Sequence, residues 1–130
     1  MESGHVPVDA LLAALPNTPE ARRDWRVWRV FSDQATRSEP LMMQFRESAQ
    51  AWLQTTVTGI ATHFGCTPDE ARLDAEMVHA LVDAIGHAAG VDPESWPIKR
   101  QRQLLEHCLA RLSVAQPRVA AVPGENPIAT

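Results

Sequence analysis

The sequence predicts an all-α protein, a helical bundle of about five helices. Apolar residues recur at intervals of three or four along each long segment, and residues that cap helices stand at the segment boundaries. No segment alternates apolar and polar residues over a useful length, as a half-buried strand does. The 130 residues, 45% of them hydrophobic, suffice for one domain with its own core.

Prolines divide the first part of the chain into helices. An apolar segment over 8–15 is expected to form a brief helix that stops before Pro16. Thr18 stands where an N-cap would, and Pro19 fits the first helical position. These two residues predict a second helix that runs from Pro19 to about Thr36.

The next two helices also have start signals. Ser38 can cap a long helix that ends near Gly65, because glycine is favoured just after a last helical turn. Thr67 and the residues after it form a capping-box pattern. This pattern leaves two readings open: one helix over 68–89 that begins at Pro68, or a single turn followed by a helix from Asp74.

The last helix is predicted over 97–112, after a break at the Gly-Val-Asp-Pro sequence 90–93. Residues 1–7 are polar and contain glycine and proline, and 113–130 contain three prolines and show no periodicity. Both ends are therefore expected to be disordered, which leaves a single domain over 8–112.

The helix over 68–89 is apolar around most of its circumference. One small core rarely covers such a helix on all sides, so its second side is a candidate subunit interface. The polar residues form one narrow stripe, which includes Glu76, His79, Asp83 and His87. The stripe spans three turns, too far for one ion, so neither a metal site nor a cofactor is predicted.

Aromatic side chains gather on one side of the helix over 19–36, at Trp25, Trp28 and Phe31. So much aromatic area must be buried against other helices or around an apolar ligand, and both remain open. Asp24 lies in the same apolar arc and has two readings. It is either an anchor for a cationic ligand or, preferably, a carboxylate paired with an arginine such as Arg46.

Five segments share an order and spacing with one known family. They are Arg-Arg-Asp-Trp-Arg-Val-Trp at 22–28, Ser-Glu-Pro-Leu at 38–41, Ala-Leu-Val-Asp-Ala-Ile at 80–85, Val-Asp-Pro-Glu at 91–94, and the aliphatic helix 105–112. Together they resemble the BetI-like type of C-terminal domain of TetR-family transcriptional regulators. Ala84 stands where the family usually has glycine.

The resemblance implies a dimer and a pocket. In the family, the last two helices of two subunits pack as a four-helix bundle. Here that interface would comprise Val78, Leu81, Val82, Ile85, Leu105, Leu109 and Leu112. The effector pocket lies among the three preceding long helices, and its lining would come from Trp28, Phe31, Met42, Phe45, Trp52 and Thr56.

The resulting hypothesis is a ligand-sensing, dimer-forming domain of a TetR-like repressor, with a small, largely apolar effector and a homodimer as its partners. DNA would be bound only through a helix-turn-helix headpiece that is absent from these residues. The alternative is a headless helical interaction protein that pairs with a complete regulator or another helical partner. No catalytic grouping of serine, histidine and aspartate is evident, so no enzyme is predicted.

Charge and cysteine content bear on nucleic-acid binding, metal binding and cellular location. A net charge of −4 argues against nonspecific nucleic-acid binding by the chain as a whole. Cys66 and Cys108 lie far apart and fit no metal spacing. No signal peptide and no membrane span are apparent, so reduced thiols and a cytoplasmic location are expected.

Overall fold

The computed structural model describes residues 6–117, and all regular structure among them is helical. The elements in chain order are α1 (Val6–Ala13), α2 (Pro19–Ala35), α3 (Glu39–Phe64), α4 (Pro68–Val91), the 3-10 turn η2 (Pro93–Ser95), α5 (Ile98–Ala110) and the 3-10 turn η3 (Ser113–Ala115). The five α-helices confirm the predicted all-α class.

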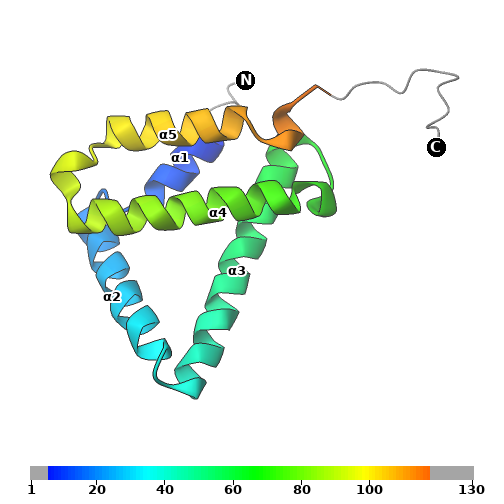
Figure 1. Ribbon diagram of the computed structural model, residues 1–130. Helices are drawn as coiled ribbons and strands as arrows, with labels where there is room; N and C mark the ends of the chain where they lie inside the picture. Colours follow the sequence, from blue (N-terminus) through cyan, green and yellow to red (C-terminus); the bar gives the residue numbers. More distant parts are fainter. Residues whose placement is uncertain (1–5, 118–130) are drawn as a thin grey trace, which may run out of the picture.

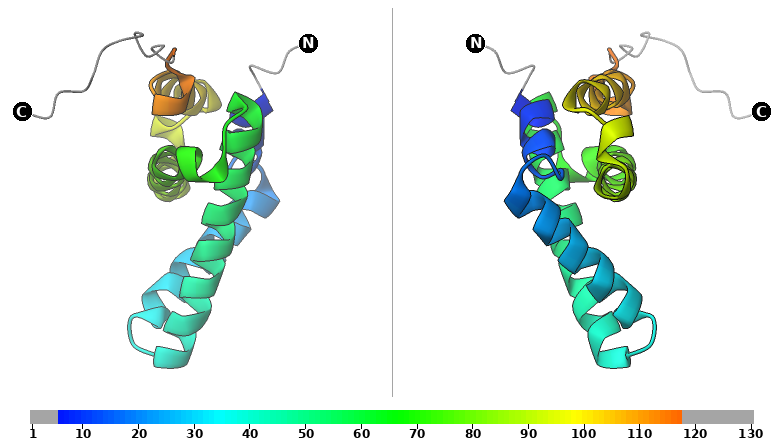
Figure 2. Two further views of the ribbon diagram at one scale, coloured as in Figure 1. Left: turned by 90° about the vertical axis from the view of Figure 1, so that its right-hand side faces the viewer. Right: turned by 90° about the vertical axis from the view of Figure 1, so that its left-hand side faces the viewer.

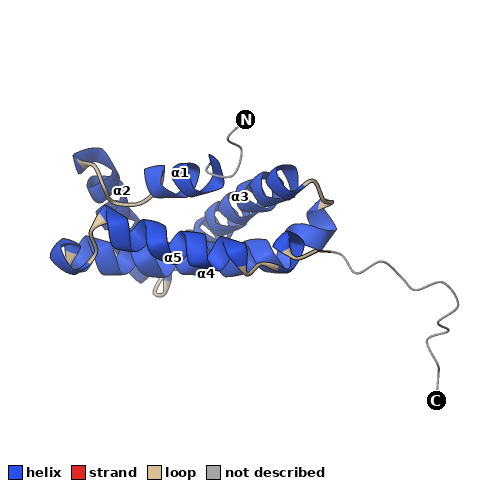
Figure 3. Ribbon diagram, turned by 90° about the horizontal axis from the view of Figure 1, so that it is seen from above, coloured by secondary structure: helices blue, strands red, loops and turns tan. Residues whose placement is uncertain are grey.

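The helices form two layers. α4 and α5 lie side by side and antiparallel in one layer, while α1, α2 and α3 make up the other (Figures 1 and 2). The view from above shows both layers with no strand among the described residues (Figure 3). α2 and α3 diverge from the tight turn that joins them, and α4 crosses their far ends, so the three helices outline a triangle (Figure 1). This triangle is where a cavity can form.

The predicted helix starts are confirmed by hydrogen bonds. Thr18 caps α2 by accepting from the Ala21 backbone N–H at 3.1 Å, and Ser38 caps α3 by accepting from the Leu41 N–H at 3.4 Å. α3 ends at Gly65, whose φ of 66° is left-handed and suits glycine. Local side chains therefore fix both ends of the α2–α3 hairpin.

A single helix α4 begins at Pro68, so the first of the two predicted starts is correct and the start at Asp74 is wrong. Thr67 and Glu70 form the predicted capping box, with the Glu70 carboxylate accepting from the Thr67 N–H at 3.0 Å. Asp74, the alternative start, lies nearly two turns inside the helix and is only 4% exposed. Its carboxylate accepts instead from the backbone N–H groups of Ser113, at 3.2 Å, and Val114, at 2.9 Å.

Two segments expected to be disordered are therefore partly ordered. Val6 and Pro7 belong to α1, and residues 113–115 form η3, which Asp74 holds against α4. A long-range cap of this kind leaves no pattern in the local sequence. Residues 1–5 and 118–130, where the rest of both predictions falls, lie outside the described residues.

The core lies between the two layers and is made by small and aliphatic side chains from α3, α4 and the segments around α1 and α5, and Trp25 of α2 packs against it. Its buried members include Leu15, Val57, Ile60, Ala71, Ala75, Val78, Val82, Ile85, Leu105, Leu109 and Leu112. Burial of each large aliphatic side chain contributes about 1.5–3 kcal/mol. The core is thus concentrated where α4 packs against α5 and α3.

A buried amide pair ties the α1–α2 connection to α5. Gln101 is 1% exposed, and its side chain exchanges two hydrogen bonds with Asn17, at 2.8 and 2.9 Å. The same Gln101 amide nitrogen donates to the Trp96 carbonyl oxygen at 2.9 Å. These bonds satisfy a polar group that would otherwise destabilise the core.

The Cys108 thiol is expected to react slowly. Burial first, and the nearby Asp74 carboxylate second, raise its pKa above the usual 9.0. Less thiolate is therefore present at a given pH, and thiolate is the nucleophile. In a Cys66→Ser chain, the rate of iodoacetamide alkylation should rise at higher pH in the folded protein than in urea. An inflection at the same or lower pH in the folded protein would contradict this expectation.

Candidate ligand-binding cavity

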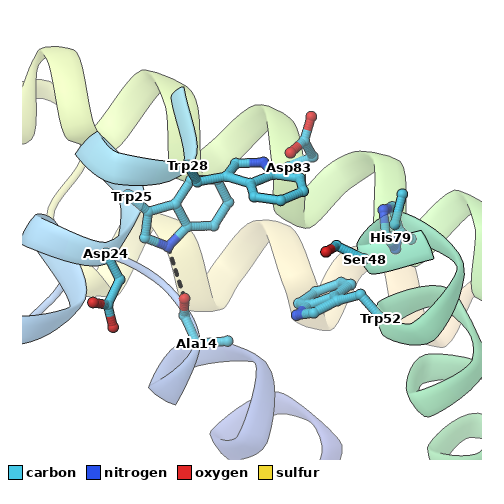
Figure 4. A pocket seen from close by; sticks show the side chains of 9 residues that line it. Ala14, Asp24, Trp25, Trp28, Ser48, Trp52, His79 and Asp83 are labelled. Atoms are coloured by element: carbon cyan, nitrogen blue, oxygen red, sulfur yellow. Dashed lines mark hydrogen bonds between the residues drawn. The ribbon is translucent and has the colours of Figure 1, made fainter. Parts of the chain in front are cut away.

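A cavity of about 310 Å³ opens inside the triangle of α2, α3 and α4 (Figure 4). Its walls are formed by Ala14, Asp24, Trp25, Trp28, Ser48, Ala49, Trp52, His79 and Asp83. Trp52 is 37% exposed, so the cavity communicates with solvent. Trp25, Trp28 and Trp52 place three indoles in the wall, and an aromatic, largely apolar wall is typical of sites for small organic molecules.

Trp25 forms the wall of the cavity nearest α1. Its indole Nε1 donates to the carbonyl oxygen of Ala14 at 2.8 Å, as the dashed line in Figure 4 shows. The six-membered ring of the indole lies directly against Gly86, a buried residue of α4. Trp25 also packs on the hydrophobic core. One side chain therefore links the turn after α1 with α2 and α4 at the edge of the cavity.

Trp28 joins the cavity to an aromatic cluster between α2 and α3. Its ring stacks on Phe45, with ring centroids 5.1 Å apart and planes inclined by 19°, and lies 5.7 Å from Phe31. On the opposite wall, Trp52 meets His79 edge to face at 4.7 Å. These contacts hold two indoles in fixed orientations on facing walls.

The polar groups of the cavity are acidic or neutral. Asp24 and Asp83 contribute carboxylates at its rim, Ser48 a hydroxyl and His79 an imidazole (Figure 4). No lysine or arginine lines the cavity, and within residues 6–117 neither carboxylate has an ion-pair partner. The preferred pairing of Asp24 with an arginine such as Arg46 is not present among residues 6–117, where Arg46 lies 3.9 Å from Glu39 on its own helix instead.

The family model for the C-terminal domain of BetI-type transcriptional repressors matches residues 8–114. The chain belongs to this family. Comparison with curated proteins and with solved structures found no match. This BetI-type domain is thus a regulatory domain of the TetR class, and every residue of the cavity wall lies within the matched range.

The cavity of the BetI-type domain contains a serine, a histidine and an aspartate, but they do not form the hydrogen bonds of a catalytic triad. The Nδ1 atom of His79 is buried and has no hydrogen-bond partner, whereas a catalytic triad requires this atom to donate to the carboxylate. Asp83 lies one turn from His79 on α4 and is at the rim. Across residues 6–117 no group of three potential ligands gathers in a way that could hold a metal ion.

The structure places the six predicted pocket residues of the BetI-type domain in two groups. Trp28 and Trp52 line the cavity. Phe31 and Phe45 lie behind Trp28 in the aromatic cluster, and the Thr56 hydroxyl donates to the Trp52 carbonyl oxygen at 3.1 Å. Met42 is half-buried on α3 and does not line the cavity. The wall residues that the sequence did not indicate for the pocket include Ser48, and also His79 and Asp83 of the α4 stripe. Trp25, for which core packing and ligand contact both remained open, lines the cavity and also packs on the core.

Six of the seven residues predicted for the dimer interface lie in the core of the chain itself. They are Val78, Val82, Ile85, Leu105, Leu109 and Leu112, and only Leu81 is half-buried. α4 and α5 of one chain use these side chains to pack against each other. Contacts with a second copy would therefore come from neighbouring positions, and the interface itself stays a prediction.

The BetI-type domain has an exposed apolar stripe on α4 beside those core residues. Leu73 and Met77 are 75% and 57% exposed. Together with Ala80 and Ala84, also exposed, they follow one another at steps of four and three residues, so all four share one face of the helix.

No helix within residues 6–117 is both long and apolar enough to cross a membrane.

Proposed function

We propose that this chain is the ligand-sensing and dimer-forming domain of a TetR-like transcriptional repressor in the cytoplasm. The carrying observation is the cavity between α2, α3 and α4, inside the part of the chain that the BetI-type family matches. A small, largely apolar effector would bind there. The cavity volume of about 310 Å³ suits a compact organic molecule of one or two rings.

The chemistry of the wall limits the effector's charge. Three indoles favour an apolar or aromatic body, and their faces also attract cations. Asp24 and Asp83 repel anions, and no basic side chain is present to neutralise one. The proposed effector is therefore neutral or cationic.

Effector binding would act by shifting helix packing. A molecule between α2, α3 and α4 contacts all three helices, so it favours the arrangement in which these contacts are best. In a complete regulator, this shift would alter the spacing of two DNA-reading headpieces across the dimer. The domain itself would supply the sensing and the pairing.

Native mass spectrometry of the full chain tests the proposal. The expected result is a homodimer that retains small-molecule mass from cells, or that takes up 2-phenylethanol and phenethylammonium more readily than 3-phenylpropanoate. Ser48→Trp should fill the cavity and abolish uptake. Gln50→Trp, an exposed change on the same helix outside the cavity, should leave uptake intact. Equal uptake by the two variants would contradict a site in this cavity.

The dimer should separate when charge is placed on the exposed stripe of α4. Met77→Glu is expected to raise the dimer dissociation constant at least about tenfold, roughly 1.4 kcal/mol, while the chain stays helical. Val27→Glu is the matched control, since Val27 is similarly exposed, at 63%, but lies on α2. Sedimentation velocity over a range of concentrations measures both. The α4 interface is refuted if the two variants dimerise like the parent chain.

A further inference from the structure

We infer that residue 86 determines the size of the ligand that the cavity admits, because the absence of a side chain there keeps the Trp25 indole out of the cavity. This inference rests on the proposed function and concerns the same site. It makes Gly86 a positioning residue, which shapes the wall without touching the ligand.

The first step is the contact itself. A methyl group built on Gly86 would overlap three carbon atoms of the Trp25 six-membered ring, Cη2, Cζ2 and Cζ3. An overlap of this depth cannot be relieved by small adjustments, so one of the two elements would have to move. Gly86 lies inside the long helix α4, which packs on α2, α3 and α5. The indole is therefore the part that moves.

The second step is the direction of movement. On its other sides the indole is held by the Ala14 carbonyl oxygen, 2.8 Å from Nε1, and by the hydrophobic core. The side that remains open is the cavity of about 310 Å³, of which Trp25 already forms a wall. A ring displaced from Gly86 would swing into this space and break its bond to Ala14. The cavity would then become smaller at the end nearest α1.

The choice of glycine has no other evident structural reason. Gly86 does not have a left-handed backbone, since Gly65 is the single described glycine with positive φ. A glycine inside a helix destabilises it by about 1 kcal/mol relative to alanine. Gly59, on α3, would accept a methyl group with nothing within 4 Å. Close approach of Trp25 thus distinguishes position 86 from an ordinary helical glycine.

The test is a double-mutant cycle with 6-propionyl-2-(dimethylamino)naphthalene, a neutral two-ring dye whose fluorescence reports transfer to an apolar site. Gly86→Ala in the full chain should bind the dye at least about tenfold more weakly than the parent. Trp25→Leu removes the ring, so the pair Trp25→Leu/Gly86→Ala should bind within about threefold of Trp25→Leu alone. Gly59→Ala is the matched control and should bind like the parent.

The outcomes separate the inference from the proposed function. The inference is overturned if Gly86→Ala binds the dye as the parent does, or if Trp25→Leu fails to relieve its loss. If Gly86→Ala does not fold, recovery of both folding and dye binding in the double variant supports the inference, and recovery of neither overturns it. If the parent binds neither the dye nor any compound in the mass-spectrometric test, the proposed function fails and the inference fails with it.

Discussion

Ile85→Glu is expected to unfold the chain rather than split a dimer. Ile85 is 1% exposed, in the core between α4 and its neighbours. The substitution removes about 1.5–3 kcal/mol of apolar burial and introduces a carboxylate that has no partner there, which costs several kcal/mol more. Domains of this size are stable by about 5–15 kcal/mol. Circular dichroism should therefore show loss of most helical signal at 25 °C.

Two matched variants make this expectation specific. Ile85→Val keeps the site apolar and should cost only about 0.5–1.5 kcal/mol in urea unfolding. Met77→Glu puts the same charge on the exposed face of the same helix and should leave the fold intact. A cooperative, fully helical monomer of Ile85→Glu would instead show that Ile85 faces a second subunit, as the sequence alone suggested.

Helix boundaries could be predicted because their causes are local. Thr18, Ser38 and Thr67 each accept a hydrogen bond from the backbone N–H of the residue three positions later. The start of each helix is therefore determined by four or five consecutive residues. Asp74 is also a residue that can cap a helix, but its carboxylate accepts hydrogen bonds from backbone N–H groups about forty positions later in the chain. Sequence patterns do not distinguish a local cap from a distant one.

The cavity could be predicted only in part because helical periodicity does not give the angles between helices. Trp28 and Trp52, which the family resemblance implied for the pocket, line the cavity, but the sequence did not show that α4 crosses the ends of α2 and α3. That crossing brings His79 and Asp83 to the cavity, although the spacing of their polar stripe indicated only that the stripe is too long to hold one metal ion.

The angles between helices, which periodicity does not give, also explain why most residues predicted for the dimer interface lie in the core of the chain itself. A helix that is apolar on most sides must be covered, but its sequence does not say whether the cover comes from its own chain or another. In the structure, α5 and α3 cover Val78, Val82 and Ile85. The exposed face with Leu73 and Met77 was not singled out, because single apolar residues at a surface are common.

Asp74→Ala is expected to lower the free energy of unfolding by roughly 2–3 kcal/mol. The carboxylate is 4% exposed and accepts two backbone hydrogen bonds, from Ser113 and Val114. Without it, both N–H groups lose their partner, and η3 loses its connection to α4. Asp74→Asn retains one acceptor oxygen and should recover about half of the loss, measured by urea unfolding.

The control for this experiment is Glu76→Ala, an exposed acidic residue on the same helix, which should change stability by no more than about 0.5 kcal/mol. Hydrogen exchange gives a local readout, because the Ser113 and Val114 amides should lose protection in Asp74→Ala and keep it in Glu76→Ala. Since Asp74 also raises the pKa of Cys108, Asp74→Ala should speed alkylation of that thiol. Equal stability and equal amide protection in the two variants would show that η3 is held by its apolar contacts, Val114 and Ala115, rather than by the buried carboxylate.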